Sequence, residues 1–225
     1  MQGFLLALPV LLVSVVTHEY AHGFAALRQG DPTAAQLGRL TFNPLKHIDP
    51  WMSLLLPAML WFGSNGQFVF GGAKPVPVNP ANFRDYRRGD IIVSGAGIAA
   101  NLALFVVFLA LSAAVGIVGG MMPFARGGLI VVQQVFLLGI WLNALLAFFN
   151  IIPIPPLDGS HILYHFLPPH MAKQYRELSR YGFLILLGLM ILFKDYFFLL
   201  LLPAVWVTRF AVDLIGPLLL QGSPF

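Results

Sequence analysis

Two histidines and a glutamate form the pattern His18-Glu19-Tyr20-Ala21-His22 near the start of the chain. On a helix, His18 and His22 lie one turn apart on the same face, where their imidazoles can bind one metal ion. Glu19 lies beside them, and its carboxylate can take a proton from a water molecule that the metal activates. The pattern lies in an apolar stretch, where ionisable side chains are costly and are usually kept for function. It predicts metal-assisted hydrolysis at a membrane; a polar cluster satisfied by helix packing is the alternative.

A third metal ligand is needed, because catalytic zinc usually has three protein ligands. The chain contains no cysteine, so the ligands must be histidines and carboxylates. Asp158 is the leading candidate, because it follows a proline-rich run that breaks the backbone directly after an apolar stretch. Broken backbone at membrane depth is tolerated where it lines a cavity or is buried in protein. The alternative role for Asp158 is an N-cap for a helix that starts near Ser160.

The composition indicates which elements position these residues. Hydrophobic residues make up 58% of the 225 residues and charged residues only 10%, which is too apolar for a soluble domain of this size. Apolar stretches that we interpret as spans cover 3–27, 91–118, 129–149 and 181–193, and a fifth is expected at 197–220. The shorter stretch 51–62 is a tilted helix, a re-entrant element or half of a hairpin with 67–70. We predict an all-α polytopic membrane protein with five to six transmembrane helices.

Two segments of unusual composition separate these stretches. The proline density of 71–80 excludes a helix and predicts a short membrane-associated β-strand or extended segment between the first spans. Such a segment could offer an edge to an unwound substrate peptide, or could simply anchor the chain at the membrane surface. Small residues at i and i+4 in 94–101 favour close helix packing over a catalytic role.

The net charge of +4 reflects membrane topology rather than a nucleic-acid surface. The connection between the spans at 91–118 and 129–149 carries only Arg126, whereas the segment between the first span and Ile91 is rich in cations. Those cations are Arg28, Arg39, Lys46, Lys74, Arg84, Arg87 and Arg88. The positive-inside bias therefore places that segment in the cytoplasm, and a second basic segment, 173–180, is predicted to lie there as well.

Two motifs together resemble the site-2 protease family of intramembrane zinc metalloproteases. They are His18-Glu19-x-x-His22 and Asn150-x-x-Pro153-x-Pro155-Pro156-Leu157-Asp158-Gly159. The runs 38–50 and 73–79 resemble the compact bacterial members, which lack PDZ or CBS domains, and the resemblance covers the chain through about His161.

The resemblance implies a role for each motif residue. His18, His22 and Asp158 would bind one zinc ion per chain, Glu19 would be the general base, and Asn150 would hold the substrate backbone. The substrates would be transmembrane or membrane-proximal protein segments in the lipid bilayer. The protein would be a multi-pass protein of the bacterial inner membrane, with its active site towards the cytoplasm and no nucleic-acid partner.

Other polar residues have two interpretations each. Asn143 points into the substrate cavity or makes an interhelical hydrogen bond, the second being favoured. His47 and His161 could support a metal ligand or gate the site, and His161 could itself be an alternative ligand. The alternative for both is a loop or interfacial histidine. His165 and His170 are expected at the membrane surface.

The domain organisation is predicted to be a single membrane domain over 1–225. It comprises a catalytic core over about 1–165 and accessory spans over about 179–220, and a homo-oligomer is left open. Two other function classes also stay open. One is a pseudoprotease that binds transmembrane helices without cutting them, and the other is a membrane metal transporter or sensor.

Overall fold

The computed structural model describes residues 2–63 and 71–221. Helices dominate these residues, and no β-strand is present among them, so the all-α polytopic fold is confirmed. Four of the described helices are long and apolar enough to cross a membrane: α1 (Gln2–Gln29), α4 (Tyr86–Met121), α5 (Arg126–Asn150) and α9 (Lys194–Leu214). Many of their large apolar side chains are exposed, as expected of an integral membrane protein.

Shorter elements connect and flank these four. The α-helices are α2 (Thr33–Gln36), α3 (Leu56–Gly63), α6 (Asp158–Tyr164), α7 (Pro169–Leu178) and α8 (Gly182–Leu192). The 3-10 and π turns are η1 (Pro44–His47), η2 (Pro50–Leu55), η3 (Pro80–Asn82), η4 (Pro123–Ala125), η5 (Ser179–Tyr181) and η6 (Gly216–Leu218).

Among the described residues, four helices have the length and composition of a span, whereas five to six spans were predicted. The stretch 181–193 does form a helix, but α8 has 11 residues and rises about 16 Å, against roughly 30 Å of hydrocarbon. The stretch 51–62 becomes η2 followed by α3, and its proposed hairpin partner, 67–70, lies outside the described residues. The segment 71–79 is extended chain without a β-strand, as the proline density predicts.

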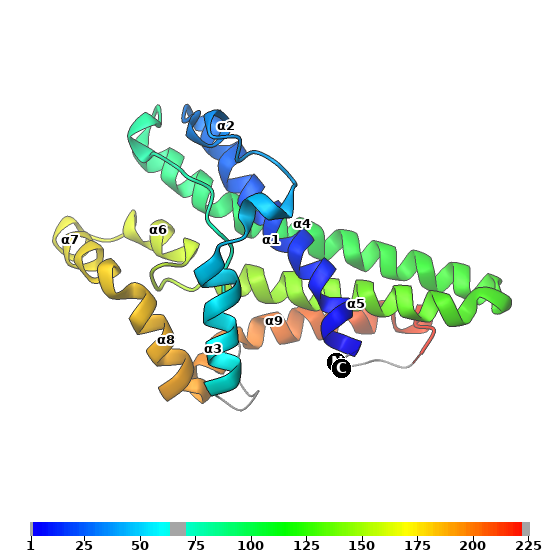
Figure 1. Ribbon diagram of the computed structural model, residues 1–225. Coiled ribbons are helices and arrows are strands. Elements are labelled where there is room, and N and C mark those ends of the chain that lie inside the picture. Colours follow the sequence, from blue (N-terminus) through cyan, green and yellow to red (C-terminus); the bar gives the residue numbers. More distant parts are fainter. Residues whose placement is uncertain (1, 64–70, 222–225) are drawn as a thin grey trace.

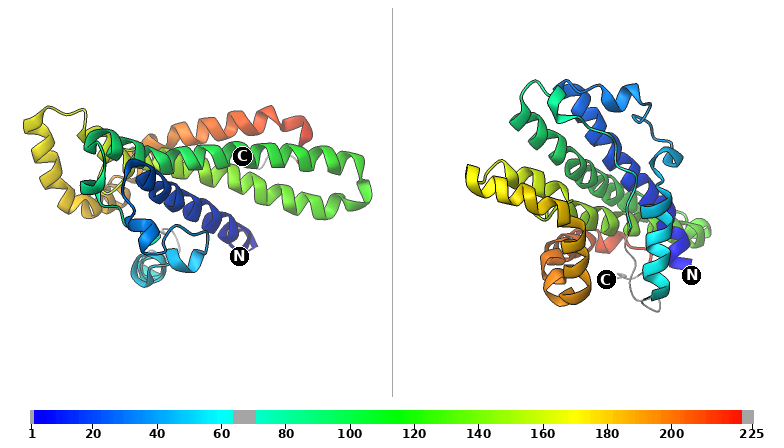
Figure 2. Two further views of the ribbon diagram at one scale, coloured as in Figure 1. Left: turned by 90° about the horizontal axis from the view of Figure 1, so that it is seen from above. Right: turned by 60° about the vertical axis from the view of Figure 1, so that its left-hand side comes forward.

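The core is an antiparallel pair, α4 and α5, with α9 lying along α5 and α1 crossing the pair (Figure 1). Buried apolar side chains from all four helices meet between them, among them Val10, Phe108, Ile140 and Val212. Figure 2 shows the same long helices from above, with α6 and α7 gathered at the end where α4 begins. The loop that joins α4 to α5 lies at the other end of the bundle (Figure 1).

The end of α1 holds the extended segment against the helix. Gly30 has a positive φ of 111°, and Asp31 N donates to Ala26 O at 2.9 Å, which closes the helix as a glycine C-cap. The fully buried carboxylate of Asp31 then accepts hydrogen bonds from Asn79 N at 2.7 Å and Asn82 Nδ2 at 2.8 Å. The chain after 71–78 is thereby tied to the end of α1.

Candidate metal centre

Helices α1 and α6 bring the three predicted ligands together. His18 and His22 share one face of α1, and Asp158 is the first residue of α6, which the prolines before it turn back towards α1. The two Nε2 atoms lie 2.9 Å apart, and Asp158 Oδ2 lies 3.3 Å from that of His18 and 3.4 Å from that of His22. We call these three residues the metal triad.

The other ring nitrogens of both histidines are engaged on α4. His22 Nδ1 lies 2.8 Å from Val93 O, and His18 Nδ1 lies 2.6 Å from Asn101 Oδ1. A carbonyl oxygen can only accept, so His22 carries its proton on Nδ1 and presents a lone pair at Nε2. This is the tautomer that a metal ligand needs.

The geometry and the donor set fit a zinc ion. The third ligand is the carboxylate of Asp158, whose Oδ2 lies within 3.4 Å of both imidazoles. Asp158 Oδ2 is buried and accepts no hydrogen bond from the described residues. Ligands 2.0–2.1 Å from a tetrahedral zinc lie about 3.3–3.4 Å apart. Both distances from Asp158 match this value, whereas the two Nε2 atoms, at 2.9 Å, lie closer together.

A glycine on α4 leaves room for these side chains. A Cβ added at Gly97 would lie 2.4 Å from His22 Nε2 and 2.5 Å from His18 Cε1. Any other residue would push against the imidazoles, so Gly97 forms one wall of the site. The pattern of 94–101 favours helix packing, and neither Gly97 nor Asn101 was predicted to belong to the site. Their spacing of four residues on an apolar span was the available signal.

Glu19, the predicted base, is held by the extended segment. Val76 N donates a hydrogen bond to Glu19 Oε2 at 2.7 Å, and the Val76 side chain is buried. Lys74 N donates to His47 O at 2.8 Å, which fixes the segment on its other side. The Val76 N–H is therefore committed to the carboxylate and is not offered to a substrate strand.

Asn150 and Asn143, the two predicted substrate-binding residues, make different contacts on α5. Asn150 is half-buried at the end of α5, and its Nδ2 donates to Leu146 O of its own helix at 3.0 Å. Asn143 is fully buried, and its amide bonds Ser14, Gly139 and Asn101. It makes the interhelical contact and offers no surface to a substrate.

The structure also shows where the other histidines lie. His47 is buried in η1, and its Nε2 contacts Thr41 O at 3.0 Å rather than the metal triad. The side chain of His165 is buried against α4, where its Nε2 lies 2.7 Å from Asp90 Oδ2, and its place at the membrane surface stays a prediction. His170 is exposed, as expected.

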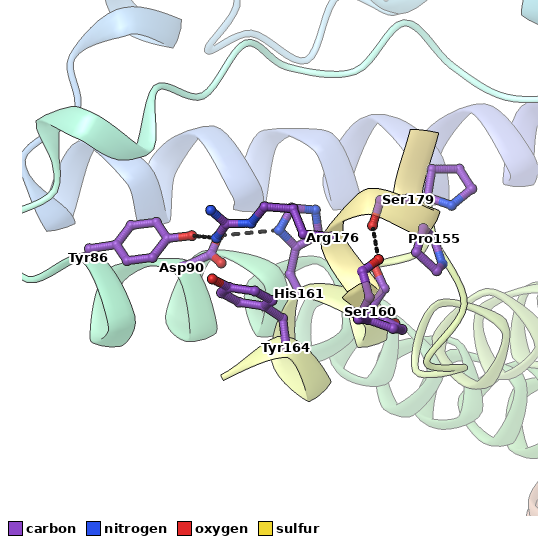
Figure 3. Close-up of a pocket in the computed structure, with 10 residues that line it drawn as sticks. Tyr86, Asp90, Pro155, Ser160, His161, Tyr164, Arg176 and Ser179 are labelled. Atoms are coloured by element: carbon purple, nitrogen blue, oxygen red, sulfur yellow. Dashed lines mark hydrogen bonds and ion pairs between the residues drawn. The ribbon is translucent and has the colours of Figure 1, made fainter. Parts of the chain in front are cut away.

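A second group of ionisable residues adjoins the site: Asp90, His161 and His165, which we call the aspartate-histidine cluster. His161 Nδ1 lies 3.4 Å from Asp90 Oδ1, and this contact raises the pKa of His161 against the opposing effect of burial. Asp90 and His161 line a cavity of about 310 Å³ together with Arg176, whose guanidinium donates to Tyr86 (Figure 3). The cavity lies beside α6.

Comparisons with known proteins agree with the geometry. A family model described as Peptidase family M50 matches residues 114–193, which include Asn150 and Asp158. "Putative zinc metalloprotease YwhC" of Bacillus subtilis is 39% identical over 184 residues, covering 80% of this chain and 78% of the relative. "Putative zinc metalloprotease Rip2" of Mycolicibacterium smegmatis is 33% identical over 192 residues, covering 84% and 67%.

A third relative, "Putative zinc metalloprotease Rip2" of Mycobacterium tuberculosis, is 34% identical over 186 residues, covering 83% of this chain and 66% of the relative. No solved structure matches the chain. The identity and coverage of these relatives confirm the resemblance that the two motifs indicate. The chain belongs to peptidase family M50, the site-2 protease family of zinc metalloproteases.

Proposed function

We propose that the chain is an intramembrane zinc metalloprotease that hydrolyses peptide bonds in or near transmembrane segments of other membrane proteins. The observation that carries this proposal is the convergence of three ligand atoms beside Glu19 within a bundle of apolar helices. Three protein ligands are typical of catalytic zinc sites, whereas structural sites have four. We expect one zinc ion per chain, bound by the metal triad.

Glu19 would act as general base and then as general acid. Zinc at the triad would supply a Lewis acid that polarises a peptide carbonyl and acidifies water. Glu19 would accept the proton of the attacking water and pass it to the leaving amine. The Val76 N–H holds Oε2 of this carboxylate, which limits the orientations of the side chain. A base fixed in this way loses little entropy when the substrate arrives.

Asn150 would hold the substrate backbone. Its Nδ2 bonds its own helix, so its Oδ1 is the atom that we expect to accept a substrate N–H. A helical substrate must first unwind near the cut, because its carbonyls are hydrogen-bonded and shielded within the helix. We therefore expect transmembrane or membrane-proximal segments with weak helical propensity to be cut fastest.

The active site would face the cytoplasm across the bacterial inner membrane. The triad lies towards the C-terminal end of α1, and the basic residues Arg28, Arg84, Arg87 and Arg88 lie near that end of α1 and at the start of α4. Arg126 lies at the far end of the bundle. This asymmetry supports the orientation through the positive-inside bias. The lipid bilayer and protein substrates are the expected partners, not nucleic acid.

The test is cleavage of a panel of tagged transmembrane proteins by purified wild type and Glu19→Gln, with bound zinc measured in both. We expect Glu19→Gln to keep its zinc and to lose about 10²–10⁴-fold in cleavage rate, as removal of a general base does. Glu177→Gln is the matched control, because Glu177 is the other glutamate of the chain and is exposed on α7.

Three results would contradict the proposal. Equal cleavage by wild type and Glu19→Gln would remove Glu19 from the reaction. Zinc binding with metal flux into liposomes and no cleavage would indicate a transporter. Substrate binding without cleavage or flux would indicate a pseudoprotease.

A further inference from the structure

A line of buried polar side chains runs from the metal triad into the middle of the bundle. Asn101 on α4, Asn143 on α5 and Ser14 on α1 have no exposed surface. His18 Nδ1 lies 2.6 Å from Asn101 Oδ1, and Asn101 Nδ2 lies 3.0 Å from Asn143 Oδ1. Asn143 Nδ2 lies 2.8 Å from Ser14 Oγ. Polar groups buried this deeply among apolar helices persist when they are hydrogen-bonded to one another.

A backbone carbonyl fixes the direction of every bond in this line. Asn143 lies 2.9 Å from Gly139 O, and a carbonyl only accepts, so the atom that faces Gly139 is the amide nitrogen of Asn143. The oxygen of Asn143 therefore faces Asn101 and must receive a hydrogen from it. Asn101 then turns its own oxygen towards His18, and His18 must donate from Nδ1.

We propose that Asn101 is a positioning residue that fixes His18 as the Nδ1–H tautomer and so directs the Nε2 lone pair at the metal position. The inference rests on the proposed function, since it assigns a role to the metal triad. Asn143 and Ser14 act one step further out by fixing the orientation of Asn101. Partners that fix the tautomer and ring orientation of a histidine ligand raise its metal affinity.

At His22, the Nδ1–H tautomer is fixed by a backbone carbonyl instead of a side chain. Val93 O is a backbone acceptor and needs no side chain to orient it. His18 has a side-chain oxygen in the same position, and an amide can present either its oxygen or its nitrogen. Asn143 and Ser14 orient the amide of Asn101 so that its oxygen, and not its nitrogen, faces His18.

The test compares Asn101→Leu with Asn101→Asp through two readouts. The first is the ¹⁵N spectrum of the imidazoles in metal-free protein at alkaline pH, where His18 is assigned by the signal that His18→Gln removes. The second is zinc affinity, measured by competition with a chelator in detergent. We expect Asn101→Leu to lose the Nδ1–H signal of His18 and to weaken zinc binding about 10–100-fold.

Asn101→Asp separates positioning from simple stability. Its carboxylate still accepts from His18 Nδ1 but can no longer donate to Asn143, so the variant should be less stable and yet keep the tautomer and most of the zinc affinity. Gln133→Leu is the matched control, because Gln133 is also buried and donates to two carbonyls, Ser112 O and Leu218 O, far from the triad. It should lose stability without weakening zinc binding.

Two outcomes would overturn the inference: a wild-type Nδ1–H signal in Asn101→Leu, or a loss of zinc affinity in Gln133→Leu as large as that in Asn101→Leu. Failure of the proposed function remains distinguishable. If the wild type bound no zinc, the ¹⁵N spectra would still report whether Asn101 sets the tautomer of His18, because they are recorded without metal.

Discussion

The metal triad and the aspartate-histidine cluster contain the same residue types in the same spacing. Each has two histidines four residues apart in the chain and one aspartate from a different helix. They are also neighbours, since α6 contributes Asp158 to the first and His161 to the second. Within the part of the chain that the structure describes, the ligand atoms of the triad alone converge as a metal site requires.

The difference lies in whether the ring nitrogens of the two histidines meet at one carboxylate oxygen. In the triad, both Nδ1 atoms contact oxygens of α4, so both Nε2 atoms turn towards the same carboxylate oxygen. In the aspartate-histidine cluster, His161 uses Nδ1 on one oxygen of Asp90 and His165 uses Nε2 on the other. Those two nitrogens meet different oxygens of Asp90 and do not converge. In the triad, the contacts with α4 turn both imidazoles towards one oxygen, so the three ligand atoms converge.

The strongest test of this contrast removes one aspartate charge from each cluster. Asp158→Asn should weaken zinc binding by more than about 100-fold, the upper range for loss of an outer-shell partner, because a neutral amide replaces an anionic ligand. Asp90→Asn should leave zinc affinity nearly unchanged. Equilibrium dialysis with metal analysis measures both. Equal losses in the two variants would mean that the clusters form one coupled site.

A smaller effect is expected at the α4 wall of the triad. Gly97→Ala places a methyl group 2.4 Å from His22 Nε2, and overpacking of this kind costs about 1–3 kcal/mol. Zinc affinity should fall by about 5–150-fold when that strain is converted at 1.4 kcal/mol per factor of ten. Gly95→Ala is the control, since a Cβ there meets nothing within 4 Å. Wild-type zinc affinity in Gly97→Ala would show that α4 can move aside.

Sequence alone predicts the parts of the molecule that depend on local pattern. The apolar stretches that form α1, α4, α5 and α9 are long enough to span a membrane, so their composition alone predicts these helices. The His18 and His22 pair follows from helical periodicity. Asp158 could be placed near the pair only through the resemblance and the broken backbone before it, because no periodicity relates it to α1.

The parts that were missed depend on contacts between distant segments. Helix α8 has the apolar composition of a span, but it has only 11 residues. Its length became known only from the structure. The contact of His165 with Asp90, 75 residues earlier, was not predicted, because no sequence pattern relates the two positions. The face of α4 that carries Gly97 is visible in the sequence, whereas the helix that it meets is not.

The smallest predicted effect is a pH dependence that should differ between the two clusters. Asp90 raises the pKa of His161 above its ordinary value of 6.5, so this pair stabilises the fold at pH below that value. The contribution is lost as pH rises through the raised pKa. It should stay under about 1 kcal/mol, because the His161 side chain is 56% exposed. Metal binding at the triad has the opposite slope, since its ligands must be deprotonated.

The test is to measure the melting temperatures of metal-free wild type and His161→Gln in detergent, from mildly acidic to alkaline pH. The wild type should be the more stable protein at mildly acidic pH, and the difference should vanish at alkaline pH, where His161 is neutral. His170→Gln is the control, because His170 is exposed and has no hydrogen bond or ion pair among the described residues. A stability difference for His161→Gln that grew with pH would mean that the ion pair with Asp90 does not form. The two clusters would then differ only in whether their ligand atoms converge.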